Sequence, residues 1–334
     1  MSRIAILGGG SWGTALAILL SRAREPHEIA LWVHDAELAN AIREKRENTV
    51  YLPGQAVPAK ISVHSKMADA LQGAAIVVGA MPSAHARQIY DEAARHLLSD
   101  VVIVSATKGL EPATHARMSE VIADVTRRPA ESHTAVLSGP SFALEAARGE
   151  PTAVVLASSD EALARTLRER FSGPNFRVYT NTDVVGVELA GAMKNVIAIA
   201  AGMCQGLGLG ANPLAALITR GLAEMTRLAV TLGAKAETLS GLAGLGDLVL
   251  TCTGALSRNR HVGTELGMGR ALTEILSGMK MIAEGVGTAV ALLALARENR
   301  VEMPITEQVN AILQGATTPA AAIREIMDRP QKRE

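Results

Sequence analysis

The sequence predicts an α/β protein in which a doubly wound, mostly parallel sheet spans residues 1–182 and an all-helical part follows in residues 183–334. Short β-branched runs alternate with helical periods in the first part, a pattern that builds βαβ units with helices on both faces of a sheet. From about Asp183 these runs give way to long helical periods punctuated by caps. The length of 334 residues also favours two domains over one.

A glycine-rich turn at the start of the chain carries the clearest functional signal. The apolar run at residues 4–7 opens into a G-x-G-x-x-G motif, and an apolar helix follows. Gly8, Gly10 and Gly13 allow the backbone to approach a pyrophosphate, and the helix aims its free N–H groups at that anion. The motif predicts that residues 1–182 form a Rossmann-type dinucleotide-binding domain. A tight strand-to-helix turn in another kind of α/β protein is the alternative.

The remaining elements follow from local patterns. Strands are expected at residues 28–33, 76–79, 101–105, 134–137, 152–156 and 177–179, and helices between most of them at 36–46, 84–98, 115–126 and 161–171. In the helical part, Asn212-Pro213 supplies an N-cap with proline at the first helical position, and Gly233 ends that helix. Thr318-Pro319 repeats the start signal.

Composition argues against several functions. The 33 Lys and Arg residues balance 33 Asp and Glu residues, and aromatic residues make up 2% of the chain, so no nucleic acid partner is expected. Cys204 and Cys252, without C-x-x-C spacing, are expected to be buried thiols in a reducing cytoplasm. Apolar stretches such as residues 289–296 are shorter than the roughly 18 residues of a membrane span, so no membrane association is expected.

Two expected strand ends carry candidate substrate-binding groups, because open parallel sheets bind ligands beyond the carboxyl ends of their strands. Lys108 follows the strand at 101–105, where it would meet an anionic or carbonyl substrate; a solvated loop lysine is the alternative. Gly139 and Ser141 follow the strand at 134–137. They either donate hydrogen bonds to a ligand or form a plain turn into the next helix.

Two charged residues interrupt apolar segments of the second part. Lys194 lies on a helix face that should be buried, and burial can bring the pKa of a lysine toward neutrality, which suits a proton-transfer catalyst. The alternatives are a snorkelling lysine or a pair with Glu188. Asp247 stands among glycines and aliphatic residues, either to orient Lys194 or the reacting hydroxyl, or as a helix N-cap.

The segment Ser257-Arg258-Asn259-Arg260 resembles a capped helix start that carries two guanidinium groups. Such a helix N-terminus with an arginine fork suits a phosphate monoester, and a solvated basic surface is the competing interpretation. The sequence shows no zinc, P-loop or serine-nucleophile motif. No metal is therefore expected, and redox chemistry carried by a cofactor is the simplest hypothesis.

Taken together, six motifs resemble the bacterial NAD(P)-dependent glycerol-3-phosphate dehydrogenases. They are G-G-G-S-W-G-T-A-L-A from Gly8, A-T-K-G-L around Lys108, S-G-P-S-F-A from Ser138, E-L-A-G-A-M-K-N-V-I-A-I from Glu188, G-L-G-D-L-V-L-T-C-T from Gly244 and S-R-N-R from Ser257. The resemblance extends to residues 301–306, and only residues 254–256 are less polar than the pattern. It implies reversible hydride transfer between NAD(P)H and dihydroxyacetone phosphate, giving sn-glycerol 3-phosphate for glycerophospholipid synthesis.

The resemblance also implies a role for each matched residue. Lys194 matches the proton acceptor, and Lys108 and Asp247 match residues that hold the reacting end, so these three form the expected catalytic set. The other substrate-binding matches are Gly139, Ser141, Ser257, Arg258 and Asn259, with Arg258 as the phosphate clamp. Cofactor contacts are expected at Gly8, Gly10, Ser11, Trp12, Gly13, His34, Lys108, Ala143, Arg258, Ile282 and Glu284.

Cofactor choice depends on the end of the second strand, where an acid favours NAD and a cation favours NADP. His34 favours NADP and Asp35 favours NAD, so use of NADH and NADPH is expected, with NADPH preferred.

A homodimer is a candidate assembly, and the site is expected to lie between the two domains. Two other functions stay open. The first is a dehydrogenase of another β-hydroxy acid or sugar phosphate, which would not need the S-R-N-R motif. The second is a non-catalytic dinucleotide sensor, which a solvent-exposed, charge-paired Lys194 would favour.

Overall fold

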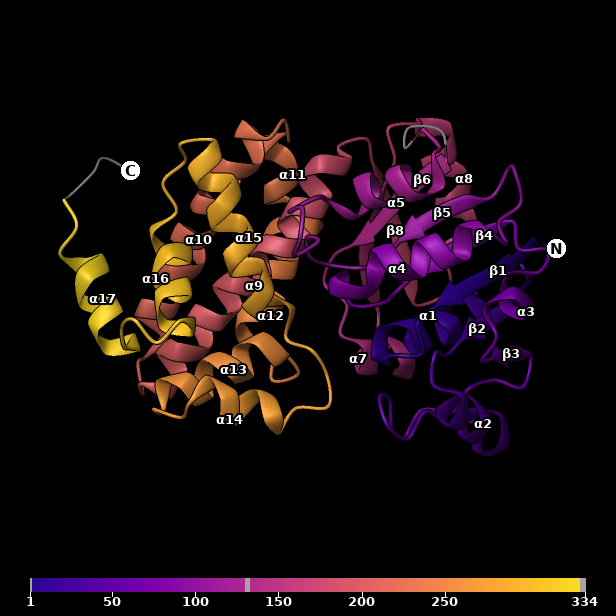
Figure 1. The fold of residues 1–334 in the computed structure, drawn as a ribbon, viewed down its shortest axis with the longest axis horizontal. Helices are drawn as coiled ribbons and strands as arrows, with labels where there is room; N and C mark the ends of the chain where they lie inside the picture. Colours follow the sequence, from indigo (N-terminus) through magenta and orange to yellow (C-terminus); the bar gives the residue numbers. More distant parts are fainter. Residues whose placement is uncertain (1, 130–132, 331–334) are drawn as a thin grey trace. The chain divides into compact units, whose positions relative to one another are not determined.

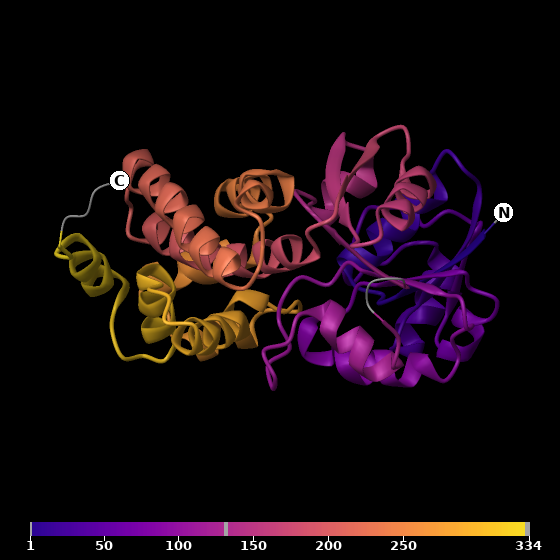
Figure 2. The same ribbon diagram turned by 90° about the horizontal axis from the view of Figure 1, so that it is seen from above.

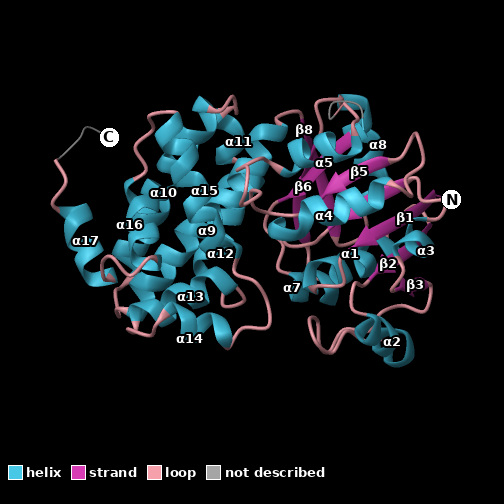
Figure 3. Ribbon diagram, viewed as in Figure 1, coloured by secondary structure: helices cyan, strands magenta, loops and turns pink. Residues whose placement is uncertain are grey.

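The computed structural model describes residues 2–129 and 133–330 and contains two compact units, Met1–Glu188 and Leu189–Glu334 (Figure 1). The first unit holds an eight-stranded sheet in the order β3-β2-β1-β4-β5-β6-β7-β8 (Figure 3). Its strands are β1 Ser2–Leu7, β2 His27–Trp32, β3 Ile61–His64, β4 Ile76–Gly79, β5 Val102–Ser105, β6 Thr134–Ser138, β7 Thr152–Ala157 and β8 Phe176–Asn181. All neighbouring strands are parallel except β6 and β7, which confirms the expected fold class.

Helices cover both faces of this sheet. They are α1 Ser11–Ser21, α2 Ala36–Lys45, α3 Met67–Leu71, α4 Ser83–Ala94, α5 Met118–Thr126, α7 Ala143–Arg148 and α8 Glu161–Phe171. Alternate residues of β1 enter different cores, because Ile4 and Ile6 pack with α1 whereas Ala5 and Leu7 pack with the α3, α4 and α5 side. Figure 2 shows α4 and α5 together along one side of the sheet. Burial on both faces explains why the strands appear in the sequence as continuous apolar runs.

The structure corrects some boundaries of the first unit. The element pair β3 and α3 was not expected, since four and five residues are too short for a clear period. Helix α5 begins at Met118 and not at His115, because His115 has a φ of 61°, which a right-handed helix excludes. Helix α4 ends at Ala94 and not at Leu98.

Every element described in the second unit is a helix. They are α9 Val184–Gly206, which begins in the first unit, then α10 Ala211–Thr231, α11 Ala236–Ser240, the π-helical turn η1 Leu242–Gly246, α12 Asp247–Thr253, α13 Arg258–Gly267, α14 Leu272–Ser277, α15 Glu284–Glu298, α16 Pro304–Leu313 and α17 Pro319–Met327. Thr318 caps α17 as expected, with its side chain accepting from the N–H of Ala321. Asn212 is not the cap of α10: the helix begins at Ala211 after Gly210, and Pro213 is tolerated because first-turn N–H groups have no intrahelical partner.

Helix α9 overturns the expectation that no apolar stretch is long enough for a membrane span. By length and composition it could cross a bilayer, with a mean hydropathy of 1.6 over its most apolar window. However, 89% of that window is buried in protein, so α9 is a core helix. Cys204 on α9 and Cys252 on α12 are both buried free thiols, as expected.

Glycines set the crossing of α9 and α13. A Cβ at Gly202 would lie 2.0 Å from the Arg260 carbonyl oxygen, and a Cβ at Gly263 would lie 1.9 Å from the Ile199 carbonyl oxygen. One turn further along, Gly206 and Gly267 stand in the same relation, with their Cα atoms facing the opposite backbone. The two helices therefore touch backbone to backbone, and this contact fixes where α13 begins relative to α9.

A buried carboxylate caps α16 from a different helix. Glu224 of α10 is fully buried, and its carboxylate accepts from the N–H groups of Ile305 and Thr306, each at 2.9 Å, and from Thr306 Oγ1 at 2.6 Å. The N-cap residue Met303 offers no side-chain hydrogen bond. Burial raises the pKa of Glu224, against the opposing effect of these three hydrogen bonds. Glu224 therefore joins α10 to the start of α16.

Glu224→Ala is expected to destabilise the protein by about 3–5 kcal/mol, because it leaves buried donors without an acceptor. Glu224→Gln, which keeps one acceptor oxygen, should cost less. The folded-state pKa of Glu224 is raised, so its ionisation opposes folding: the free energy of unfolding should fall as pH rises from the ordinary glutamate value of 4.5 toward the raised pKa. Urea denaturation at several pH values checks this, and an unchanged midpoint in Glu224→Ala would contradict the capping role.

Candidate functional site

The glycine turn after β1 forms a cradle at the start of α1. Gly8 has a φ of 130°, and a Cβ there would lie 2.6 Å from the Ala80 carbonyl oxygen. A Cβ at Gly13 would lie 1.9 Å from the Gly8 carbonyl oxygen, whereas a Cβ at Gly10 would meet no atom within 4 Å. Gly8 and Gly13 are thus required by the close packing of the turn itself, and Gly10 keeps open the space in front of it.

The first turn of α1 has the properties of an anion site. Gly10 provides no side-chain cap, and no acidic residue occupies the turn. Ser11 and Trp12 begin the helix, and the indole Nε1 of Trp12 is buried without an acceptor in the described part of the chain. Helix N–H groups, open space and an unsatisfied donor together fit the pyrophosphate end of a dinucleotide.

His34 and Asp35, which follow Val33 just beyond β2, have different roles in the structure. His34 is exposed, and its ring lies edge-on to Trp32 with 5.6 Å between centroids. The Asp35 carboxylate caps α2, accepting from the N–H groups of Glu37 at 2.8 Å and Leu38 at 3.0 Å. Asp35 is therefore committed to the helix, and His34 is the more available of the two for a ligand.

The turns after β5 and β6 meet. Lys108 Nζ donates to the Gly139 carbonyl oxygen at 2.9 Å, and Ser141 Oγ donates to the same oxygen at 2.9 Å. Ala143 begins α7 two residues later. Lys108 is part-buried and hydrogen-bonded, so it is not a fully solvated loop lysine. Lys108, Gly139 and Ser141 form one polar cluster.

The loop that carries Lys108 is anchored by a pair that sequence reasoning missed. Arg87 of α4 donates two hydrogen bonds to the buried Glu111 carboxylate, at 2.6 and 2.9 Å, and this contact lowers the pKa of Glu111. Thr107 Oγ1 donates to the Met81 carbonyl oxygen at 2.9 Å. An arginine and a glutamate 24 residues apart give no local signal by which the pairing could have been found.

In the second unit, Lys194 of α9 donates to Asp247 Oδ1 at 2.7 Å and to Thr251 Oγ1 at 2.8 Å. Lys194 is 6% exposed, so it does not snorkel, and Asp247 is 1% exposed. Asp247 is not an N-cap: it is the first residue of α12, directly after the π-helical turn η1. Thr251 was not expected, although it lies one turn beyond Asp247 on the same helix and its hydroxyl donates to the Asp247 carbonyl oxygen at 2.6 Å.

The hydrogen-bond donors of the Glu188 carboxylate belong to the first unit. The carboxylate accepts from Arg117 Nη1 at 2.9 Å, from the Ser119 N–H at 2.8 Å and from Ser119 Oγ at 2.6 Å. The structure therefore favours Asp247 over Glu188 as the partner of Lys194. The ammonium and the carboxylate form a buried charge pair, and Thr251 is a third polar group in contact with the amine.

A network of amide hydrogen bonds joins the starts of α13 and α15 to α9. Asn259 Nδ2 donates to Asn195 Oδ1 at 2.9 Å, and the Gly285 N–H donates to Asn259 Oδ1 at 3.0 Å. A Cβ at Gly285 would lie 2.7 Å from the Asn195 carbonyl oxygen, so glycine is needed there. Asn195 follows Lys194 directly, and its role as the anchor of Asn259 was not expected.

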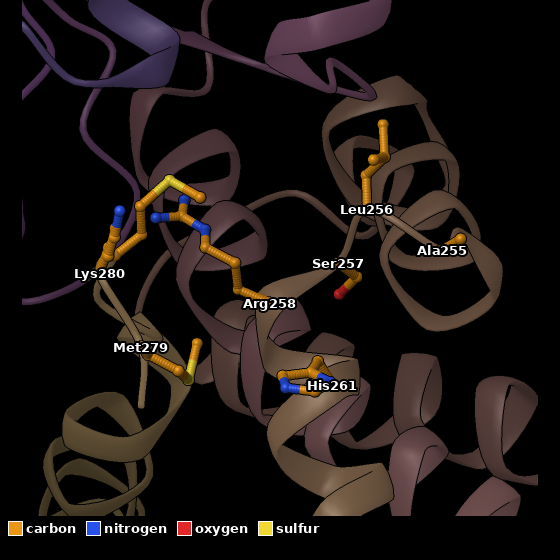
Figure 4. A pocket seen from close by; sticks show the side chains of 8 residues that line it. Ala255, Leu256, Ser257, Arg258, His261, Met279 and Lys280 are labelled. Atoms are coloured by element: carbon orange, nitrogen blue, oxygen red, sulfur yellow. The ribbon is translucent and has the colours of Figure 1, made fainter. Parts of the chain in front are cut away.

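The start of α13 lines a pocket of about 250 Å³ (Figure 4). Ser257 caps the helix by accepting from the Arg260 N–H at 3.2 Å, as expected. Arg258 lines the pocket, and burial lowers the pKa of its guanidinium while Glu284 opposes that shift. Glu284 begins α15, and Ile282, which is 46% exposed, stands two residues before it. The Arg258 side chain is exposed by surface area but lies in a concave surface, so the arrangement is compatible with an anion site and with a solvated basic surface.

The chain is similar to known proteins over nearly its whole length. The family model of the NAD-dependent glycerol-3-phosphate dehydrogenase N-terminus matches residues 3–164, and that of the C-terminus of the same enzyme matches residues 183–324. A glycerol-3-phosphate dehydrogenase of Koribacter versatilis, named for NAD(P)+, is 55% identical over 100% of this chain and 99% of its own length. A relative of the same name from Acidobacterium capsulatum is 54% identical over the full length of both chains.

A solved structure is also similar over nearly the whole chain. The crystal structure of glycerol-3-phosphate dehydrogenase from Coxiella burnetii is 40% identical, with a TM-score of 0.93, and covers 98% of this chain and 99% of its own.

Proposed function

The chain belongs to the NAD-dependent glycerol-3-phosphate dehydrogenase family, and we propose that its buried Lys194–Asp247 pair performs the proton transfer of that reaction. It is an NAD(P)-dependent oxidoreductase that interconverts dihydroxyacetone phosphate and sn-glycerol 3-phosphate. The family assignment favours this function over the related dehydrogenases and the non-catalytic sensor. A second argument against the sensor is that Lys194 is buried.

The proposed mechanism assigns the proton to Lys194. A bound nicotinamide supplies or accepts the hydride at C2 of the substrate. During reduction, Lys194 Nζ gives its proton to the C2 oxygen, and during oxidation the amine takes the C2 hydroxyl proton. Asp247 stabilises the ammonium form by its charge at 2.7 Å, and Thr251 holds the amine at 2.8 Å. The observation that carries this proposal is the burial of the ion pair, with Lys194 6% and Asp247 1% exposed.

The polar groups at the strand ends would hold the reacting part of the substrate. Lys108 and Ser141 share the Gly139 carbonyl oxygen as acceptor, so an incoming carbonyl or hydroxyl group would meet a lysine N–H and a hydroxyl at one place. We assign the dinucleotide to the α1 cradle with Ser11 and Trp12, to His34 beyond β2, and to Ala143, Ile282 and Glu284. Its phosphates would neutralise the N-terminal dipole of α1.

An assay of reduced-nicotinamide absorbance with dihydroxyacetone phosphate tests the function and the cofactor preference together. We propose turnover with both cofactors and preference for NADPH, because His34 is exposed whereas Asp35 is engaged in capping α2. A kcat/KM that favours NADH by about an order of magnitude would overturn the preference. No turnover with either cofactor would overturn the function.

Arg258→Ala is expected to raise KM for dihydroxyacetone phosphate by roughly 10- to 100-fold, the equivalent of a charge-assisted contact of about 1.5–3 kcal/mol. We propose Arg258 as the phosphate clamp, supported by its place at the capped start of α13. The substrate titration is run at saturating NADPH, because Arg258 is also proposed to contact the cofactor. An unchanged KM would remove the clamp assignment.

We further propose a cytoplasmic enzyme that supplies sn-glycerol 3-phosphate for glycerophospholipid synthesis, and a homodimer as its assembly. The buried state of α9 and of both thiols supports the location. Light scattering coupled to size exclusion tests the assembly, and fractionation of cells that produce the protein tests the location.

A further inference from the structure

Two basic side chains beside Arg258 in its pocket, Lys280 and His261, have no role in the mechanism above. Eight residues line the pocket: Ala255, Leu256, Ser257, Arg258, His261, Met279, Lys280 and Met281. None of them is acidic, and two are permanent cations, Arg258 and Lys280. His261 adds an imidazole, whose ring nitrogens can form hydrogen bonds. We propose that Lys280 and His261 complete the subsite that binds the phosphate group of the substrate.

The two side chains come from different elements, are both exposed, and line different parts of one cavity. His261 lies three residues after Arg258 on α13, so both occupy the same helix face. Lys280 lies in the segment between α14 and α15, flanked by Met279 and Met281, and its side chain extends in the same direction as that of Arg258 in Figure 4. Positive groups that share a pocket repel one another, and an anion between them relieves that repulsion.

The size and polarity of the pocket favour a small phosphate. Its volume of about 250 Å³ is below the roughly 300–1,000 Å³ of pockets for drug-sized ligands. Four of the lining residues are apolar (Ala255, Leu256, Met279 and Met281), so the polar side chains of the pocket are those of Ser257, Arg258, His261 and Lys280. The N-terminus of α13, with no acidic residue in its first turn, adds a favourable dipole. A dianionic phosphate monoester matches two cations, an imidazole and a helix end.

The inference rests on the proposed function for the identity of the ligand, because the cofactor pyrophosphate is a second source of the same chemistry. The two sources predict different kinetics. If the pocket holds the substrate, loss of Lys280 or His261 raises KM for dihydroxyacetone phosphate and leaves KM for NADPH unchanged. If it holds the cofactor, the opposite change occurs.

Lys280→Met keeps the side-chain bulk and removes the positive charge. His261→Gln keeps a polar side chain of similar size and removes the imidazole. We expect each to raise KM for dihydroxyacetone phosphate about two- to fivefold, and the double variant about tenfold, with kcat within about twofold. The inhibition constant of inorganic phosphate against dihydroxyacetone phosphate should rise in parallel. Lys235→Met is the matched control, since it removes an exposed lysine of the same unit that does not line this pocket.

Calorimetric binding of inorganic phosphate to the wild type and the double variant gives a readout that does not depend on turnover. Weaker phosphate binding by the double variant supports the subsite. An unchanged KM for dihydroxyacetone phosphate in the double variant, or a higher KM for NADPH, would overturn it. A wild type that binds phosphate without reducing dihydroxyacetone phosphate would contradict the proposed function and not the pocket's affinity for phosphate.

Discussion

Lys194→Met is expected to lower kcat for dihydroxyacetone phosphate reduction by about a hundred- to ten-thousandfold, because it removes the proposed proton donor. Methionine has a similar length and suits a site that is 6% exposed, so the side-chain volume is largely kept. Affinity for NADPH should persist, since the substitution removes proton transfer and leaves the α1 cradle intact. Single-turnover kinetics and NADPH fluorescence titration measure the two effects separately.

Loss of Lys194 also leaves the Asp247 carboxylate buried without its cation, a change that typically costs about 3–5 kcal/mol of stability. The double variant Lys194→Met/Asp247→Asn removes both charges and should recover most of that stability. If Lys194 transfers the proton, turnover stays low although the fold is restored. Recovery of kcat in the double variant would show that the single substitution acted through stability, and would end the assignment.

The sequence was sufficient to place the first unit because its elements are locally encoded. The run of residues 4–7 followed by glycines predicted β1, the turn and α1, and the apolar runs predicted most other strands. The elements and boundaries that the sequence does not predict depend on tertiary contacts or on the backbone angles of single residues. Residues 61–64 form a strand only because β2 offers its edge, and the positive φ of His115 delays α5. The antiparallel pairing of β6 with β7 is decided by chain path, on which local periodicity carries no information.

The sequence names candidate residues for the site, but it does not predict the contacts between them. Lys194 and Asp247 stood out because a charge on an apolar helix requires a reason. Their pairing spans 53 residues and depends on the π-helical turn Leu242–Gly246, which shifts the face that the following helix presents. A period of 3.6 residues carried across that turn would place Asp247 and Thr251 incorrectly. Thr251 and Asn195 were missed for the same reason: their partners are visible only in the folded chain.

The helical glycines of α9 and α13 carry a further signal that hydrophobic periodicity does not include. Glycine in a helix costs about 1 kcal/mol relative to alanine. Four of them, spaced four residues apart on α9 and α13, therefore needed a structural explanation. The structure supplies it, because a Cβ at Gly263 would lie 1.9 Å from the Ile199 carbonyl oxygen and 3.0 Å from the Gly202 Cα. The obstacle is backbone, which cannot move aside as a side chain can.

Gly263→Ala is accordingly expected to destabilise the protein by about 3 kcal/mol or more, since α13 must move away from α9 to admit the methyl group. The same movement would carry Arg258 and Asn259 away from their present positions, and Asn259 is held to Asn195 by a 2.9 Å hydrogen bond. KM for dihydroxyacetone phosphate should therefore rise along with the loss of stability. Urea denaturation and steady-state kinetics on the same preparation measure both.

Gly287→Ala is the matched control, because Gly287 lies in α15 and a Cβ there would meet no atom within 4 Å. Without a steric cost, alanine's higher helix propensity should stabilise the protein by about 0.5–1 kcal/mol. The two substitutions are chemically identical. If Gly263→Ala lowers the free energy of unfolding and Gly287→Ala raises it, the backbone contact of Gly263 is the cause of the difference. A Gly263→Ala variant as stable as Gly287→Ala would mean that the helices can separate at little cost, and the crossing would then not fix the start of α13.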